Sequence, residues 1–155
     1  MKPIIVDTNI VFSALVNNNS AIASFLLESQ QTLLMPKFGF VELFKHKEKI
    51  CKISKHTPDE ILEILYELIR HIDFYDENAI STDALQKAWL LVKDIDLKDM
   101  LFVALTIEMN GLLWTGDNKL RLGLEKRVLA LFLKTTLFIR RETGTTLFCR
   151  IRLDN

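Results

Sequence analysis

The feature that most constrains this chain is a short β-branched run near its N-terminus that ends in polar residues. Ile4-Ile5-Val6 is followed at once by Asp7-Thr8-Asn9. An apolar run bounded by residues that favour helix N-caps predicts a buried parallel strand, over residues 3–6, that leads into a helix. Asp7 would then stand at the carboxyl end of a central strand, where open α/β sheets bind ligands. Alternatively, Asp7 or Thr8 does no more than cap the helix.

The bulk composition indicates one domain of ordinary size. The chain has 155 residues, of which 49% are hydrophobic, enough for a core without disulfide or metal support. Cys51 and Cys149 are too few and too far apart for a disulfide framework or a thiolate metal site. No export signal is recognisable, and the apolar run over residues 128–139 is interrupted by Lys134 and too short to span a membrane. We therefore expect a cytoplasmic protein without a membrane partner.

The net charge of zero conceals an uneven distribution. Residues 1–118 carry 11 Lys and Arg against 17 Asp and Glu, whereas residues 119–155 carry 9 against 3. Such an asymmetry is typical of a polyanion-binding surface beside an acidic metal pocket. It is equally typical of two solvated faces, so charge alone leaves both interpretations open.

Apolar segments alternate with amphipathic ones along the chain, which predicts an α/β fold with a mostly parallel sheet. The expected strands cover residues 3–6, 33–35, 71–75 and 112–115. The expected helices cover residues 21–29, 37–50, 59–71, 81–93, 100–110 (ended by Gly111) and 119–126. We interpret residues 128–132 as a last strand, and residues 135–155 as a hairpin around Gly144 or a poorly docked tail. The motif-bearing core is 1–126 within a single domain, 1–155, and the role of residues 127–155 stays open.

The pattern of the opening segment occurs a second time. Residues 112–115, Leu-Leu-Trp-Thr, form an apolar run that ends in Gly116-Asp117-Asn118 and is followed by a short helical segment. Asp117 would thus occupy the carboxyl end of a second buried strand. In a parallel sheet, Asp7 and Asp117 would meet at the same edge.

Two further acids fall on the inner sides of predicted helices. Glu42 lies beside the apolar stripe of its helix, although a pairing with Lys45 or His46 one turn away would also explain it. Asp96 and Asp99 precede the long apolar helix. We assign Asp96 as its cap and Asp99 as the functional acid, because a first-turn residue can project into the crevice above the sheet.

Four carboxylates gathered at one sheet edge require either protonation or a bound cation. A ligand set of oxygens without Cys or clustered His suits Mg²⁺ or Mn²⁺ and not zinc. Magnesium held by a few carboxylates usually completes its shell with water and phosphate oxygens, which favours phosphoryl chemistry. The chain has no P-loop pattern, so hydrolysis is the simpler reaction.

Together these segments resemble the four signature segments of PIN domains. They are Val6-Asp7-Thr8-Asn9, Val41-Glu42-Leu43, residues 99–105 (Asp-Met-Leu-Phe-Val-Ala-Leu) and residues 114–120 (Trp-Thr-Gly-Asp-Asn-Lys-Leu). The resemblance covers residues 1–126 in the right order and spacing. It implies a three-layer α/β/α sandwich and a metal-dependent ribonuclease. Many stand-alone prokaryotic members are VapC-type toxins of toxin–antitoxin pairs.

Carried over by position, the resemblance makes Asp7, Glu42, Asp99 and Asp117 the catalytic, metal-binding acids. Asn9 and Thr115 would orient Asp7 and Asp117. It also implies a homodimer and a cognate antitoxin protein. We expect RNA to be contacted from the basic C-terminal third by Lys119, Arg121, Lys126 and Arg127. Many members carry an acid where this chain has Lys119, which places a second metal ion in doubt.

Three other interpretations remain at this stage. A haloacid-dehalogenase-type phosphatase also begins with an apolar strand and Asp, but it needs a second Asp where this chain has Asn9. A catalytically weak PIN-like module could bind RNA or protein without cleaving. Finally, all four acids could be caps or surface pairs, which requires four coincidences in order. The three histidines show no acid–base spacing suited to a histidine-driven ribonuclease.

Overall fold

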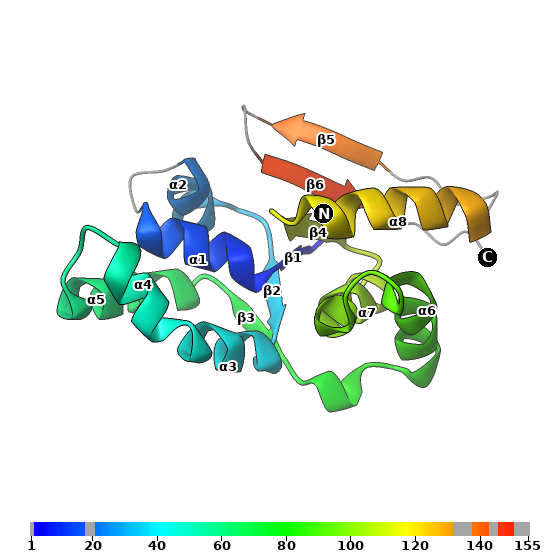
Figure 1. Cartoon of the computed structure of the whole chain (residues 1–155), viewed down its shortest axis with the longest axis horizontal. Coiled ribbons are helices and arrows are strands. Elements are labelled where there is room, and N and C mark those ends of the chain that lie inside the picture. The colour runs from blue at the N-terminus through cyan, green and yellow to red at the C-terminus, as the bar shows by residue number, and fades with distance from the viewer. Residues whose placement is uncertain (1, 18–20, 132–137, 143–145, 151–155) are drawn as a thin grey trace.

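The chain folds around a twisted sheet in which four parallel strands are extended by an antiparallel hairpin (Figure 1). The computed structural model describes residues 2–17, 21–131, 138–142 and 146–150, with side chains as far as residue 127. Over these residues the strand order is β3-β2-β1-β4-β6-β5. The strands are β1 (Ile4–Val6), β2 (Leu33–Pro36), β3 (Asp73–Tyr75), β4 (Leu112–Thr115), β5 (Phe138–Glu142) and β6 (Thr146–Arg150).

Helices cover both faces of the parallel strands, which confirms the α/β class and the PIN-like architecture (Figure 1). Helix α7 packs on β1, β2 and β4 with α6 outside it, while α1, α2 and α5 group on the opposite side. The helices are α1 (Thr8–Val16), α2 (Ala21–Glu28), α3 (Lys37–Lys45), α4 (Lys47–Ile53), α5 (Pro58–Ile69), α6 (Thr82–Val92), α7 (Met100–Glu108) and α8 (Asn118–Leu131). Two short 3-10 turns, η1 (Glu77–Ala79) and η2 (Leu97–Asp99), complete the described elements.

The core lies on both faces of β1 and β4. All three β1 residues are buried, and so are Phe102 to Thr106 in α7. Trp114 in β4 is 1% exposed and meets Phe25 of α2 edge-on, with ring centroids 5.0 Å apart. Each such large apolar side chain stabilises the fold by roughly 1.5–3 kcal/mol when fully buried. Strands β1 and β4, which Asp7 and Asp117 follow, are therefore strongly stabilised by burial.

The strand order reverses between β1 and β4. From β1 the chain moves outward through β2 and β3, and it then returns to place β4 on the other side of β1. Such a reversal opens a crevice at the carboxyl ends of the two strands, because their following segments diverge. The Asp7 N–H donates to the Trp114 carbonyl at 3.0 Å, so the two strand ends stay paired up to the candidate acids.

Three sequence-based boundaries are corrected. The helix expected over residues 37–50 breaks at His46 into α3 and α4. Residues 128–131 continue α8, so the expected strand at 128–132 is wrong; a four-residue apolar run does not distinguish strand from helix. At the end of α7 the left-handed residue is Asn110, with φ 46°, and not Gly111.

The C-terminal hairpin is confirmed as far as its strands are described. Strand β6 pairs antiparallel with β4, which places Leu147 opposite Thr115, and β5 pairs antiparallel with β6. The turn around Gly144 and the last five residues lie outside the described part of the chain. Over the described residues, no single helix is long and apolar enough to cross a membrane.

Candidate active site

The structure brings the four predicted acids to one cavity at the β1–β4 strand ends. The cavity has a volume of about 370 Å³. Asp7 reaches it from the end of β1, Glu42 from α3, Asp99 from the start of α7 and Asp117 from the loop after β4. The remaining lining residues are Thr8, Asn9, Phe12, His46, Lys49, Asp96 and Lys98.

Asp7 is the most buried of the four acids, at 4% exposure. Its Oδ1 accepts the Asn9 N–H at 3.4 Å, so it does cap α1. Its Oδ2 accepts the Asn9 side-chain amide at 2.7 Å and the Thr115 hydroxyl at 2.6 Å. The capping interpretation and the site interpretation are therefore compatible, because a cap residue at a sheet edge still faces the cavity.

Asn9 and Thr115 tie the two strand ends together, as the sequence predicts. The Asn9 Oδ1 accepts the Gly116 N–H at 2.9 Å, while its Nδ2 donates to Asp7. The Thr115 hydroxyl donates to Asp7 and accepts the Asp117 N–H at 3.0 Å. Asn9, after β1, thus holds the backbone that follows β4, and Thr115, at the end of β4, holds the carboxylate of Asp7.

Asp117 has one carboxylate oxygen occupied by its own helix. Its Oδ1 accepts the N–H groups of Lys119 at 2.7 Å and Leu120 at 3.0 Å, which satisfies two donors at the α8 N-terminus. No hydrogen bond to its Oδ2 is found among the described residues. This arrangement leaves a lone-pair-bearing oxygen for a cation.

Glu42 is held from the β1 side of the cavity and not by its own helix. The Thr8 hydroxyl donates to Glu42 Oε2 at 2.9 Å. The alternative pairing with Lys45 or His46 is absent from the described residues, so the one-turn surface pair does not account for this acid.

Asp96 is a capping residue, as expected, whereas Asp99 is not. Asp96 caps η2, because its Oδ1 accepts the Lys98 N–H at 3.0 Å. Asp99 precedes α7 without any side-chain capping bond. Its carboxylate has no hydrogen-bond partner in the described part of the chain, although it is partly buried. A carboxylate in that position is available for a ligand.

Crowding of the acids raises two pKa values. Burial raises the pKa of Asp7 to about 6; bonds from Thr115 and Asn9 oppose the rise, and the charges of Glu42 and Asp117 add to it. Burial also raises the pKa of Asp99 to about 7, with further contributions from the four other cavity acids, Asp7 foremost. Both carboxylates therefore favour a neighbouring positive charge.

The donor set fits a hard divalent cation. Asp7, Glu42, Asp99 and Asp117 offer only oxygen ligands, which Mg²⁺ and Mn²⁺ prefer. As the side chains are placed, no three His, Cys, Asp or Glu groups among the described residues stand close enough to bind one ion together. Binding of one ion by these acids would therefore require their carboxylates to move closer together.

The four residues predicted to contact RNA differ in whether they already form ion pairs within the protein. Lys119 and Lys126 are exposed and form no ion pair with a described residue. Arg121 pairs with Glu125 at 2.8 Å, and Arg127 binds Asp94 at 2.6 Å and the Leu90 carbonyl at 2.9 Å. The two arginines thus have partners within the protein, and RNA contact by any of the four residues stays a prediction.

Sequence reasoning missed several cavity residues that carry polar groups. The sequence suggests Thr8 only as a cap, although its hydroxyl holds Glu42. It does not single out Lys49 or Lys98. A usable signal existed for Lys98, which is adjacent to Asp99. For Lys49 the signal was weaker, because the break at His46 changes which residues of α3 and α4 share a face.

Comparison with known proteins agrees with this geometry. The family model described as PIN domain matches residues 5–140, which is most of the chain. The chain therefore belongs to the PIN domain family, and the haloacid-dehalogenase interpretation is set aside. PIN domains are generally nucleases that use divalent metal ions, so membership supports a nuclease activity. No curated protein matches the chain.

Proposed function

We propose that this PIN protein is a Mg²⁺- or Mn²⁺-dependent endoribonuclease. The observation that carries the proposal is the placement of Asp7, Glu42, Asp99 and Asp117 around one cavity at the reversal of the strand order. A divalent ion held by these acids would activate water for attack on a phosphodiester and neutralise charge on the leaving oxygen. The all-oxygen ligand set and the family membership both support this reaction class.

The protein's own residues prepare the site in three ways. The Thr115 and Asn9 bonds fix Asp7 before any ligand arrives, so little ordering is left for the binding step. Thr8 holds Glu42 on the opposite wall. Asp99 offers a carboxylate without a hydrogen-bond partner among the described residues, so its oxygens are available to the ion.

The function is tested by incubating purified protein with a structured RNA in Mn²⁺, Mg²⁺ or EDTA. We expect cleavage with either metal, and none in EDTA or with the Asp7→Asn/Asp99→Asn double variant. Glu63→Gln is the matched control, because Glu63 is an exposed acid on α5 outside the cavity. Failure of a folded, metal-loaded protein to cleave any RNA would favour the PIN-like binding module instead.

The ends of the products distinguish the mechanism. Hydrolysis by activated water does not need the RNA 2′-hydroxyl and leaves a 5′-phosphate. A 2′,3′-cyclic phosphate would instead require attack by the 2′-hydroxyl and would contradict the proposed mechanism. Single-stranded or loop RNA is the expected substrate, because the cavity must reach an exposed phosphodiester.

The proposal extends to a toxin role within a toxin–antitoxin pair. Induced expression in a bacterial host is expected to arrest growth, and the Asp99→Asn variant is expected not to. Normal growth at equal levels of folded wild-type protein would contradict a toxin role in that host. A cognate antitoxin would be recovered as a protein whose co-expression restores growth.

A homodimer is part of the same proposal. Five large apolar side chains on α3 and α5 are exposed to solvent, which is the kind of surface that interfaces cover. They are Phe40, Val41, Phe44, Leu62 and Tyr66. Light scattering coupled to gel filtration tests the proposal directly. A mass near twice 17.9 kDa is expected, and a monomer at micromolar concentration would contradict it.

A further inference from the structure

The basic residues of this chain also gather outside its C-terminal third. The segment over residues 45–55 spans the end of α3, all of α4 and the turn that follows. Within it a single acid, Glu48, accompanies five lysines: Lys45, Lys47, Lys49, Lys52 and Lys55. The overall charge division of the sequence hides this cluster, because the first 118 residues are acidic on average.

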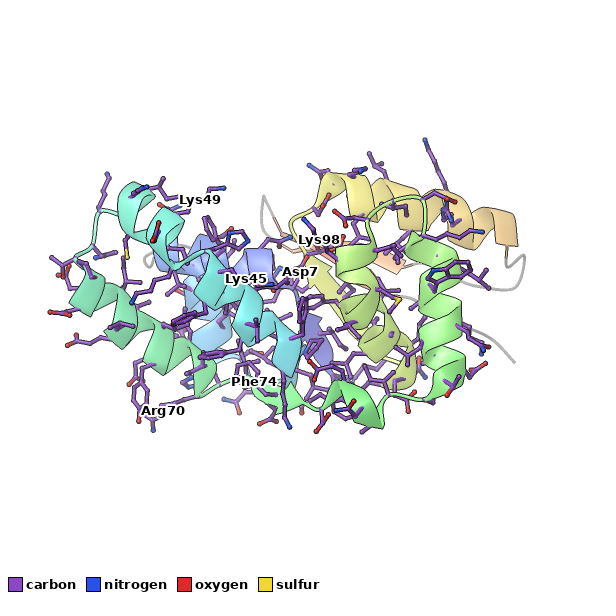
Figure 2. The ribbon with its side chains drawn as sticks, turned by 60° about the horizontal axis from the view of Figure 1, so that its bottom comes forward. Asp7, Lys45, Lys49, Arg70, Phe74 and Lys98 are labelled. Atoms are coloured by element: carbon purple, nitrogen blue, oxygen red, sulfur yellow. The ribbon has the colours of Figure 1, made fainter. Side chains whose placement is uncertain are left out.

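One lysine of this cluster and one from a distant segment reach the acidic cavity. Lys49 from α4 and Lys98 from η2 both line it, together with Asp7. These three residues are labelled in Figure 2. The two come from different parts of the fold, since α4 belongs to the helices near α1 whereas η2 leads into α7. The cavity that the acids line therefore also has two cationic side chains, one from each of these parts of the fold.

Neither ammonium group is used in an ion pair. Lys49 and Lys98 form no salt bridge with any described residue, although five carboxylates line the same cavity. The Lys49 Nζ lies instead over the Phe12 ring, 5.5 Å from its centroid. A cation held over an aromatic face is kept at the cavity wall and retains its charge for an anionic ligand.

We propose that Lys49 and Lys98 bind the phosphates that flank the scissile phosphate of a single-stranded RNA. This inference rests on the proposed function, since it takes the acid cluster as the cleavage centre. A strand lying in the cavity would meet both lysines as well as the acids. Repulsion between the RNA backbone and the carboxylates makes flanking cations necessary for binding before the metal contributes.

Phe12 is a positioning residue in this scheme. Its ring holds the Lys49 ammonium group and also meets His46 edge-on, with centroids 6.3 Å apart. Phe12→Leu keeps most of the apolar volume but removes the aromatic face. We expect it to weaken RNA binding less than the loss of Lys49 itself, and to leave the number of phosphate contacts unchanged.

The test measures RNA binding without cleavage. A short fluorescein-labelled single-stranded RNA is titrated in EDTA with the inactive Asp99→Asn protein, and with the same protein carrying Lys49→Gln, Lys98→Gln or both. Anisotropy is recorded between about 50 and about 200 mM salt. Lys52→Gln is the matched control, because Lys52 lies on the same helix as Lys49 but outside the cavity lining.

Each cavity substitution is expected to weaken binding roughly tenfold at low salt, the size of one charge-assisted contact. Each should also reduce the slope of log K against log salt by about 0.7, and the double substitution by about 1.4. Lys52→Gln should leave the slope unchanged. The lysines are exposed, so all variants should keep the parent's circular dichroism and unfolding temperature.

Equal affinities and slopes for the cavity variants and the Lys52 control would overturn the inference. In that case the two lysines only offset the negative charge of the acids, or the RNA binds outside this cavity. The outcome is separate from that of the cleavage assay. Lysine-dependent binding without cleavage would support this inference and contradict the nuclease, whereas cleavage with lysine-independent binding would do the reverse.

Discussion

At the scale of single residues, one hydroxyl joins the two strand-end acids. The Thr115 Oγ1 donates to Asp7 at 2.6 Å and accepts from the Asp117 N–H at 3.0 Å, and the Asn9 amide completes the link. The sequence predicts Asp7 and Asp117 because each follows closely on a strand, whereas Asn9 and Thr115 are implied by the resemblance to PIN domains. It does not predict the bond between Thr8 and Glu42, because that contact spans 34 positions and depends on how α3 packs against α1.

Removal of this hydroxyl tests its orienting role. Thr115→Val keeps the shape of the side chain, but it leaves Asp7 Oδ2 and the Asp117 N–H without their partner. We expect RNA cleavage to fall by 10- to 100-fold, the usual effect of losing a residue that orients a metal ligand. Thr115→Ser should restore most of the activity. Equal cleavage rates for Thr115→Val and the wild type would show that the bond does not matter.

The raised pKa values predict an unusual pH dependence of stability. Each of the two carboxyls has an ordinary pKa of 3.8, which we take for the unfolded chain. Folding raises the pKa to about 6 for Asp7 and to about 7 for Asp99. The folded state binds more protons between these values, so the free energy of unfolding falls as pH rises from about 4 to about 7. For buried Asp7 the shift corresponds to roughly 3 kcal/mol.

Urea unfolding of the metal-free protein across this pH range measures the effect. Asp99→Asn should flatten the decline, since it removes one titrating group and relieves repulsion on Asp7, whereas Glu63→Gln should not. Added Mn²⁺ should oppose the decline, because a cation favours the ionised forms. Stability that rises steadily from pH 4 to pH 7 in EDTA would contradict the described crowding of acids.

At the scale of elements, the junction between α7 and β4 shows how packing overrides local signals. The helix end is predicted only to within two residues, since α7 ends at Glu108. Asn110 adopts the left-handed conformation, and Gly111 serves another purpose. An added Cβ at Gly111 would lie 2.8 Å from the Pro3 carbonyl oxygen and 2.4 Å from Ile5 Cδ1. Proximity to β1, which sequence alone does not reveal, therefore requires glycine there.

Gly111→Ala should consequently destabilise the protein. The added methyl group would meet backbone that has little room to move, and overpacking of this kind costs about 1–3 kcal/mol. Chemical denaturation of the variant beside the wild type gives the value. Gly116→Ala is the comparison, because the nearest atom to its Cβ would be Asn9 Oδ1 at an ordinary 3.4 Å. Equal losses at both positions would contradict the close approach at Gly111.

At the scale of the whole molecule, the C-terminal hairpin completes the sheet. The sequence suggests a hairpin, but it does not say where the hairpin docks, because antiparallel pairing with β4 joins segments more than 30 positions apart. The pairing covers the free edge of the strand that ends in Thr115, so the hairpin lies beside one side of the candidate site. Alternation of apolar and amphipathic segments predicts a mostly parallel α/β sheet, but it does not predict the strand order.

A chain ending at Leu131 tests this docking. Without β5 and β6, the β4 edge would present unpaired N–H and carbonyl groups, and exposed edges of this kind promote aggregation. We expect a lower unfolding temperature and lower solubility than for the full chain. An unchanged unfolding temperature, with unchanged RNA cleavage, would show that the hairpin contributes nothing to the sheet.

The structure gathers Asp7 after β1, Glu42 on α3, Asp99 at the end of η2 and Asp117 before α8, and we claim that these acids form one metal centre. The most direct test is a crystal structure of the full chain soaked in Mn²⁺, with anomalous data collected on the metal. We predict an anomalous peak in the cavity, coordinated by carboxylate oxygens of Asp7, Glu42, Asp99 and Asp117. A cavity without a peak in crystals that bind Mn²⁺ at another place would contradict the claim.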